Sequence, residues 1–264
     1  MNGNILYNTI SLQTYNPATR VGIITNMIDH TSIPEKQSSV YALAHSNSSV
    51  ISYVNYPSKK ITIGGVIKGS SEDDLDVRTD AFKGYFIGQD KNLDIDYAGS
   101  TRRYIATANS ISVTRQQSSL YATFAIEFLC TQPFGIDTAD TTALNTTGNT
   151  TSNYNPSYTF LGSAPYQLPV ITVTYSAMTG NGTAQLVRIG NNDTGQVIVI
   201  NRIWSATDVI VIDCYRKLVQ VNGLDVPFTG AFPEFHPGPS AFSYSDTLTT
   251  RTFAFNVIYK VAYL

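Results

Sequence analysis

The sequence predicts a mainly β protein in two parts, an N-terminal β-barrel-like domain with one α-helix and a C-terminal jelly-roll β-sandwich. Three observations lead to this fold class. Short segments of alternating apolar and polar residues recur along the chain, one stretch has helical character, and a polar segment separates two halves rich in apolar residues. At 264 residues the chain is long enough for two domains of ordinary size.

The first half, residues 1–136, is predicted to be the barrel-like domain. Residues 93–97 and 104–108 alternate apolar and polar side chains on either side of Gly99, which indicates a hairpin. The other segments with this alternation are 5–9, 21–25, 40–43, 50–53, 59–68, 111–114 and 121–129. We therefore expect a β structure with a helix packed on it.

The helix is predicted over residues 70–84. One of the two serines at 70–71 can cap its N-terminus, and three acidic residues at 72–74 fill the first turn, where the helix dipole favours negative charge. Leu75 and Phe82 make the stripe that is expected to face the sheet, and the range ends at a glycine that can stop the helix.

Residues 137–155 are predicted to be a polar linker or a long loop, because they are rich in Thr and Asn and nearly lack large apolar residues. Residues 156–264 are predicted to form the sandwich. Asn222-Gly223 lies between two apolar runs and predicts a type I′ hairpin turn. The short strands expected in this half are 158–161, 170–176, 184–189, 196–201, 208–214, 217–221, 241–244 and 252–263.

The overall composition limits the classes of function. The formal net charge is −2 and the pI is near 5.9, so no global positive field recruits nucleic acid or an anionic membrane. The N-terminus lacks the features of a signal peptide, and no apolar run approaches the roughly 20 residues that span a membrane. We therefore expect no membrane insertion, and a protein that is made in a cytosol and is soluble there.

The two cysteines are expected to be buried thiols that act as small apolar side chains. Each shares a strand face with apolar residues, Cys130 with Phe128 and Cys214 with Ile212. Neither has a second Cys or a His at ligand spacing, so no metal site is predicted. No nucleotide-binding loop or catalytic motif is recognisable either, so we predict no cofactor and no catalytic residues.

Motifs in both halves of the chain carry a resemblance to a known family. The hairpin turn and the aromatic bend that follows contribute Asn222, Gly223, Gly230, Phe232, Pro233, Pro237 and Gly238, and the end of the first half contributes Pro133, Phe134 and Gly135. Together with the segments 60–65, 94–104 and 162–171, these motifs occur in the order found in the distal tail proteins (Dit), the siphophage tail-component family of long-tailed bacteriophages. The chain resembles that family over most of its length.

The resemblance implies a structural protein of the phage tail tip or baseplate. It implies a galectin-like C-terminal sandwich and a homo-hexameric ring formed by the N-terminal half around a DNA channel, with DNA passing through without specific binding. The expected partners are the tail tube protein, the tail-hub protein and a receptor-binding protein. The expected location is the virion tail tip, after synthesis in the host cytoplasm.

Two other classes of function stay open at this point. The first is a carbohydrate-binding module for host-surface adsorption, in which Trp204 and Tyr215 stack on a cell-surface sugar. The second is a glycan hydrolase that uses paired carboxylates from Asp94, Asp96 and Glu127. Because these acids alternate with apolar residues, a solvated strand face explains them better than catalysis does.

Overall fold

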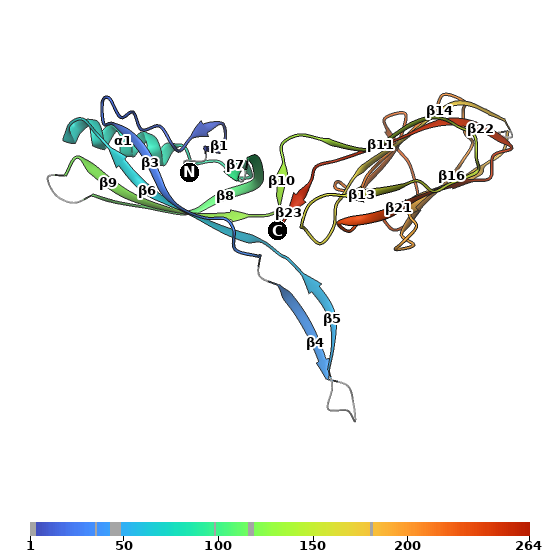
Figure 1. Cartoon of the computed structure of the whole chain (residues 1–264), viewed down its shortest axis with the longest axis horizontal. Coiled ribbons are helices and arrows are strands. Elements are labelled where there is room, and N and C mark those ends of the chain that lie inside the picture. Colours follow the sequence, from blue (N-terminus) through green and yellow to red (C-terminus); the bar gives the residue numbers. More distant parts are fainter. Residues whose placement is uncertain (1–3, 35, 43–48, 98, 116–118, 180–181) are drawn as a thin grey trace. The chain divides into compact units, whose positions relative to one another are not determined.

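The chain folds into two compact units, residues 1–136 together with Leu264, and residues 137–263. The computed structural model describes residues 4–34, 36–42, 49–97, 99–115, 119–179 and 182–264, and only the backbone within 38–42 and 49–55. Figure 1 shows strands in both units, with the helix in the first. A mainly β fold is confirmed.

The first unit is built on one antiparallel sheet. Its described strands lie in the order β2-β1-β7-β8-β9-β6-β3. Their bounds are β1 Ile5–Tyr7, β2 Ile10–Ser11, β3 Gly22–Asp29, β6 Lys59–Lys68, β7 Lys91–Tyr97, β8 Ser100–Arg115 and β9 Tyr121–Cys130. The short strand β10 (Gly135–Asp137) follows at the boundary of the units. Alternate residues of β6, β7 and β9 are buried, as the alternation in the sequence predicts.

The predicted barrel-like sheet of the first unit does not close into a barrel in the described part of the chain. Its end strands, β2 and β3, are not paired with each other in the described part of the chain. Residues 12–16 cross the gap instead, with the backbone N–H of Thr14 donating to the carbonyl of Ile23 at 3.0 Å. The ladder stays open because β2 has only two residues and the chain then turns at Asn16-Pro17.

The helix α1 (Glu72–Gly84) lies where it is predicted and packs against β6 and β9. Ser71 is its N-cap, since its hydroxyl accepts a hydrogen bond from the backbone N–H of Asp74 at 3.2 Å. Leu75 and Phe82 are buried as expected, with the Phe82 ring 4.7 Å from that of Phe124. The helix continues through Gly84 to a C-cap with right-handed backbone geometry, so this glycine does not stop it in a left-handed conformation.

The predicted strands at 104–108 and 111–114 are one continuous strand, β8. It pairs with β7 in the predicted hairpin and with β9 along its other side. A bulge between Ala108 and Ser110 absorbs one extra residue, so pairing continues across the break in the apolar pattern.

A second structure in the first unit is a two-stranded hairpin of β4 (Gln37–Ala42) and β5 (Ser49–Asn55). In the described residues these strands pair only with each other (Figure 1). The sequence predicts a strand pair here, and residue 43 of the predicted first strand lies outside the described residues.

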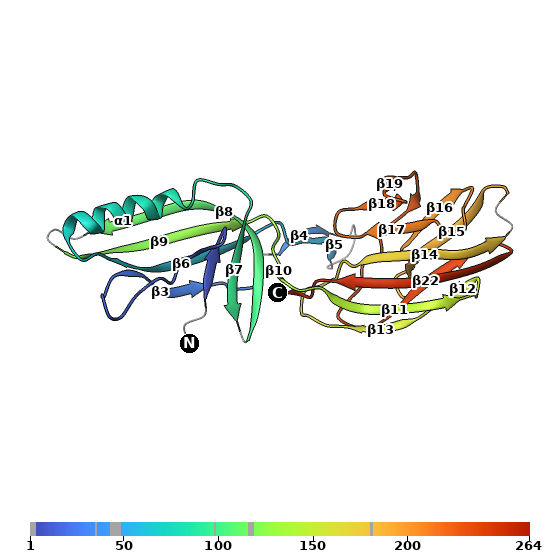
Figure 2. The same cartoon turned by 90° about the horizontal axis from the view of Figure 1, so that it is seen from above.

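The second unit is a β-sandwich, as predicted (Figure 2). One sheet has the strand order β11-β22-β14-β17-β18-β19, and the other has the order β12-β21-β15-β16-β20, with β13 also paired to β21. The bounds are β11 Thr141–Asn149, β12 Asn153–Tyr154, β13 Ser157–Phe160, β14 Val170–Thr179, β15 Gln185–Asn191, β16 Val197–Arg202, β17 Val209–Asp213, β18 Leu218–Val221, β19 Leu224–Asp225, β20 Thr229–Gly230, β21 Gly238–Asp246, β22 Thr250–Tyr259 and β23 Ala262–Tyr263.

The inner faces of the two sheets share one apolar core. The expected alternation along the last long strand is observed in β22, where Phe253, Phe255, Val257 and Tyr259 are buried. The predicted strand 252–263 is interrupted after Tyr259, and the chain resumes as β23.

The prediction of a linker at 137–155 is wrong. β11 occupies most of that segment and pairs along β22, so it belongs to the sandwich. Ala143 and Leu144 pack against the core, while Thr142, Asn145 and Thr147 are exposed on this edge strand. Threonine is favoured in strands, so a polar edge strand and a polar loop have similar compositions.

Both cysteines are free and buried, as predicted. Burial raises the pKa of Cys130 and of Cys214 to about 12. At neutral pH both are therefore thiols rather than reactive thiolates.

Candidate functional site: sheet edges for assembly

The edge strand β3 offers the clearest place in the first unit where a second chain can pair. Its first half is covered by residues 12–16, and the backbone N–H of Thr25 donates to the side-chain oxygen of Gln13 at 2.7 Å. From 26 to 29, no backbone partner is described on the side away from β6. Met27, in this open part, is 50% exposed. An open edge of this kind is a template for another strand.

The β4–β5 hairpin is a second such place. An isolated two-stranded hairpin is at best marginally stable in water, and a third strand or a packed surface normally stabilises it. Within the described residues each strand has one paired side and one open side. Since β3 and this hairpin follow one another in the chain, the open backbone described in the first unit is concentrated in residues 26–29 and in β4 and β5.

The edges of the second unit are blunted instead. β11 carries two register shifts along β22, between Thr142 and Leu144 and between Thr146 and Asn149. The other described edge strands of this unit, β12, β13, β19 and β20, have two to four residues each. Bulges and very short edge strands are the means by which β proteins avoid edge-to-edge pairing.

Among the family-motif residues, Asn222 and Gly223 form the predicted turn between β18 and β19. Their φ angles are +53° and +77°, which a type I′ turn requires. The Asn222 side chain also accepts a hydrogen bond from the backbone N–H of Val209 and donates one to the buried carboxylate of Asp208 at 2.8 Å. The turn is thereby fastened to the start of β17.

The motif residues from 230 to 238 form the bend that connects β20 to β21, two strands of the same sheet. Gly230 has φ +101° and lies so close to β16 that a β-carbon would contact the Val197 carbonyl oxygen. Phe232 packs edge-on against Phe228, and Pro233 is buried. Pro237 is exposed and is followed by Gly238, whose φ is +104°.

Pro133, Phe134 and Gly135 are buried at the end of the first unit. The Phe134 ring packs edge-on against Tyr56, with ring centroids 5.3 Å apart. A β-carbon at Gly135 would lie 2.7 Å from the Tyr104 hydroxyl, so the position has no room for a side chain unless that ring moves. A structural role for these motif residues remains a prediction.

The predicted sugar-stacking pair is not a platform. Trp204 is 1% exposed, its ring packs against Tyr175, and its indole N–H donates to the carbonyl of Gln185 at 2.9 Å. A sugar therefore cannot reach the indole face. Tyr215 is 50% exposed, in the turn after β17. The prediction for Trp204 is wrong because the apolar ring is part of the core.

The carboxylates on β7 have structural partners. Asp94 accepts two hydrogen bonds from Arg103, both 2.7 Å long, and this contact raises the pKa of the guanidinium. Asp96 accepts a hydrogen bond from the hydroxyl of Thr101 at 2.7 Å. Both acids thus stabilise the β7–β8 hairpin.

Glu127 lies elsewhere on the same sheet. Hydrogen bonds from Asn109 and from Lys60 lower its pKa. It is paired in register with Ser110, whereas Asp94 is paired with Arg103, seven positions earlier on β8. That offset is roughly 23 Å along the strand, well beyond the roughly 5–10 Å between catalytic carboxylates of a glycosidase.

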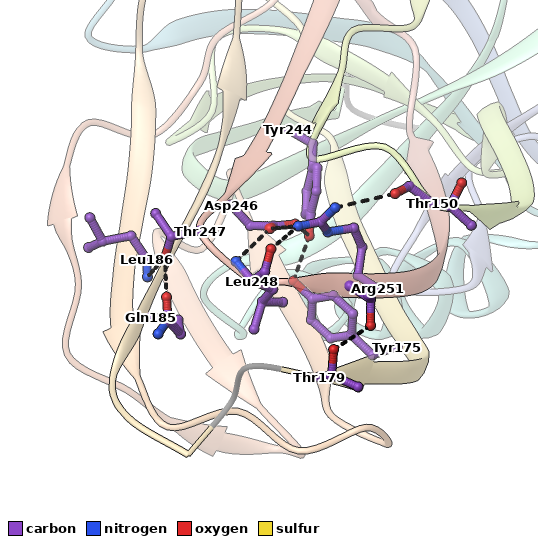
Figure 3. Close-up of polar contacts among 11 residues, drawn as sticks. Thr150, Tyr175, Thr179, Gln185, Leu186, Tyr244, Asp246, Thr247, Leu248 and Arg251 are labelled. Atoms are coloured by element: carbon purple, nitrogen blue, oxygen red, sulfur yellow. Dashed lines mark hydrogen bonds and ion pairs between the residues drawn. The ribbon is translucent and has the colours of Figure 1, made fainter.

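A buried polar cluster joins the two sheets of the sandwich (Figure 3). The carboxylate of Asp246 on β21 accepts a hydrogen bond from Arg251 on β22 at 2.8 Å and one from the Tyr244 hydroxyl at 2.5 Å. The hydroxyls of Tyr244 and Tyr175 are 2.8 Å apart, and Arg251 also donates to the carbonyl of Leu248. Burial raises the pKa of both tyrosines. The cluster is a buried link between the two sheets.

Sequence reasoning missed these polar residues and two others that hold distant segments together. Gln167 is fully buried, and its side chain exchanges hydrogen bonds with the backbone of Ala262. Lys59 is buried in the first unit, where its ammonium donates to the carbonyl of His30. Their partners are distant in sequence, so no local pattern identifies them.

The described residues contain no group of three or more His, Cys, Asp or Glu side chains placed to hold a metal ion. No helix in the described part of the chain is long and apolar enough to cross a membrane.

Part of the chain is similar to a known protein family. Residues 162–263 match the family described as siphovirus-type tail component, C-terminal domain. The matched range lies within the second unit. Comparison with curated protein sequences gives no match.

The whole chain has the fold of the Dit protein of phage SPP1, described as a paradigm of the hub adsorption apparatus in phages that infect Gram-positive hosts. The TM-score is 0.72 at 13% sequence identity, over 99% of each chain. A chain of the phage P2 baseplate in its activated conformation gives a TM-score of 0.43 at 10% identity over 97% of each chain. This similarity is too low to support an inference. The resemblance to the distal tail proteins, drawn from the motifs of the sequence, is confirmed.

Proposed function

We propose that this chain is the distal tail protein of a siphophage, a structural part of the tail tip rather than an enzyme. In this role its first unit closes a homo-hexameric ring around a DNA channel. The ring joins the tail tube to the tail-hub protein, and the second unit offers a surface to receptor-binding proteins. The observation that carries the proposal is the tail-component family match together with a fold shared with SPP1 Dit over the full chain.

The distribution of open edges supports the assignment of ring closure to the first unit. A closed ring needs a heterologous interface, in which one surface of a subunit meets a different surface of the next. The 26–29 part of β3 and the open sides of the β4–β5 hairpin provide two different surfaces of that kind. The second unit has bulged or very short edges, which fits an outward position without strand pairing.

The charge of the chain fits a channel that DNA passes without being held. A lumen lined by many Lys and Arg side chains would bind phosphates, and that binding would slow passage. The formal net charge here is −2, and several arginines are already paired with carboxylates, including Arg103 with Asp94 and Arg115 with Glu72.

The test is the mass and shape of the purified full chain in solution. Light scattering should give about 173 kDa, six times the 28.8 kDa of one chain, and negative-stain images of the same fraction should show a central hole. A chain that stays monomeric both at high concentration and when mixed with a tail-hub protein would overturn the proposal.

A pair of variants tests the edge assignment. Met27→Glu places a charge on the open part of β3 and should reduce the hexamer to monomers, because buried unpaired charge is costly at an interface. The matched control is Ile203→Glu, which puts the same charge on an exposed residue of the second unit and should leave the hexamer intact. Equal loss of the ring in both variants would contradict the assignment to β3.

A further inference from the structure

A charged hydrogen bond links the two legs of the chain at the root of the β4–β5 hairpin. The chain leaves the sheet at the end of β3 and returns to it at Lys59, the first residue of β6. Lys59 is only 3% exposed, and its ammonium donates to the carbonyl oxygen of His30 at 2.6 Å. This bond joins the outgoing and the returning leg of the hairpin.

His30 itself is buried, at 7% exposure, and neither of its ring nitrogens has a hydrogen-bond partner among the described residues. The ring of Tyr97, on β7, packs against it edge to face at 5.0 Å. A neutral imidazole fits such a place. An imidazolium would have two N–H donors without acceptors, which is costly in a buried site.

The charged groups around His30 come from several strands. Lys59 on β6 and Arg102 on β8 are positive, and Asp29 on β3 is negative. The Arg102 guanidinium lies 4.4 Å from the centroid of the Tyr97 ring. Tyr104 on β8 and Cys130 on β9 adjoin Lys59, with the ammonium 5.3 Å from the Tyr104 ring centroid and Cys130 paired in register with Lys59. Both of these groups are uncharged at neutral pH, so positive charge dominates around the imidazole.

We propose that His30 and Lys59 form a pH-operated clamp at the root of the β4–β5 hairpin, which opens when His30 is protonated. At neutral pH the imidazole is neutral, the Lys59 bond is intact and the two legs at the root of the hairpin are held together. In acid the new positive charge adjoins the Lys59 ammonium and the Arg102 guanidinium, and the segment that carries His30 leaves its site. This step needs neither the proposed hexameric ring of subunits nor a partner protein.

The lowered pKa of His30 determines whether the clamp opens in acid or in base. Burial, followed by the charges of Lys59 and Arg102, lowers the pKa of His30 below its ordinary value, while Asp29 opposes the shift. A group whose pKa is lower in the closed than in the open state stabilises the closed state above the ordinary pKa of about 6.5. That stability is lost as the pH falls through the lowered value, so the clamp should open in mild acid.

The test is hydrogen exchange of the full chain between pH 7.5 and 4.5, with rates corrected for the intrinsic pH dependence of exchange. In the wild type the opening of residues 31–58 should increase by about threefold or more over this range, while β9 and β22 keep their protection. Light scattering at each pH separates this opening from dissociation of a ring. A chain that does not form the proposed hexamer can therefore be distinguished from a chain whose hairpin root does not open in acid.

Variants make the test specific. His30→Gln should give the same exchange at every pH, because no group at that site can be protonated. His236→Gln removes an exposed histidine of the second unit and should behave as the wild type does. An unchanged pH response in His30→Gln, or a wild type without any response in residues 31–58, would overturn the proposal.

A second measurement keeps the proposal testable even where His30→Gln folds poorly. The imidazole of His30 in the wild type can be titrated by NMR, and a pKa at or above the ordinary value of about 6.5 would contradict the clamp. Lys59→Met removes the neighbouring ammonium and should move the His30 titration to higher pH. It should also increase exchange of residues 31–58 at all pH values, since the bond between the two legs is lost.

Discussion

At the scale of single residues, the burial of Trp204 shows that its side chain belongs to the core of the sandwich and not to a ligand-binding surface. Its indole is buried against Tyr175 and hydrogen-bonded to the backbone of Gln185. Tyr215, the other residue considered for sugar stacking, is exposed and lies in a turn. The two residues therefore contribute very differently to stability.

Trp204→Ala should lower the free energy of unfolding by about 3–5 kcal/mol, because it removes a large buried side chain and leaves a cavity. Tyr215→Ala, the exposed control, should change it by no more than about 0.5 kcal/mol. Urea unfolding of both variants measures the difference. A Trp204→Ala protein that keeps its stability but loses binding to a glycan would instead restore the carbohydrate-binding hypothesis.

Local patterns predict burial at some residues and not at others. The burial of Cys130 and Cys214 could be predicted, because each alternates with apolar neighbours on a strand. The burial of Trp204 could not, since it stands alone between strands with no periodic partners. Asp246 and Arg251 look like surface charges in the sequence, and only the packing of two sheets makes them a buried pair.

At the scale of elements, the two glycines in the middle of β6 have different roles. A β-carbon at Gly65 would lie 2.1 Å from the carbonyl oxygen of Ile24 on β3 and 2.7 Å from the Phe124 ring on β9. At Gly64 the nearest atom is the terminal methyl of Met27, 3.1 Å away on a flexible side chain. The close approach of strands thus requires a glycine at 65 and not at 64.

Gly65→Ala should therefore destabilise the first unit by about 1–3 kcal/mol or more, because β3 must move away from β6. Gly64→Ala is the matched control, and its effect should be smaller than about 1 kcal/mol, since the Met27 side chain can shift. Thermal or urea unfolding of the two variants provides the comparison. Similar losses at both positions would show that strand conformation, rather than close approach, explains the glycine pair.

Sequence patterns predict some helices and strands of this chain and miss others. α1 was predictable because its cap, its acidic first turn and its apolar stripe all agree. β11 was not, because an edge strand with one wet face and two bulges has the composition of a loop. β8 was predicted as two strands because its bulge interrupts the alternation that marks a single strand.

At the scale of the whole molecule, the chain has two separate apolar cores. One is formed by the strands and helix of the first unit, and the other lies between the two sheets of the second. The division between Ile136 and Asp137 places β11 and β12 with the second core. Since each core draws on residues of one unit, we expect the second unit to fold by itself.

A fragment of residues 137–263 should therefore unfold cooperatively, with a melting temperature that is independent of its concentration. A fragment that begins at residue 156 lacks β11, leaves the outer side of β22 unpaired, and exposes the part of the core that Ala143, Leu144 and Tyr154 cover. It should lose cooperative unfolding or aggregate, because an open apolar edge pairs with other chains. Circular dichroism melts and light scattering of both fragments make the comparison. If the shorter fragment were as stable and as monomeric as the longer one, residues 137–155 would be a dispensable linker after all, and the strand pairing of β11 would contribute little to the sandwich.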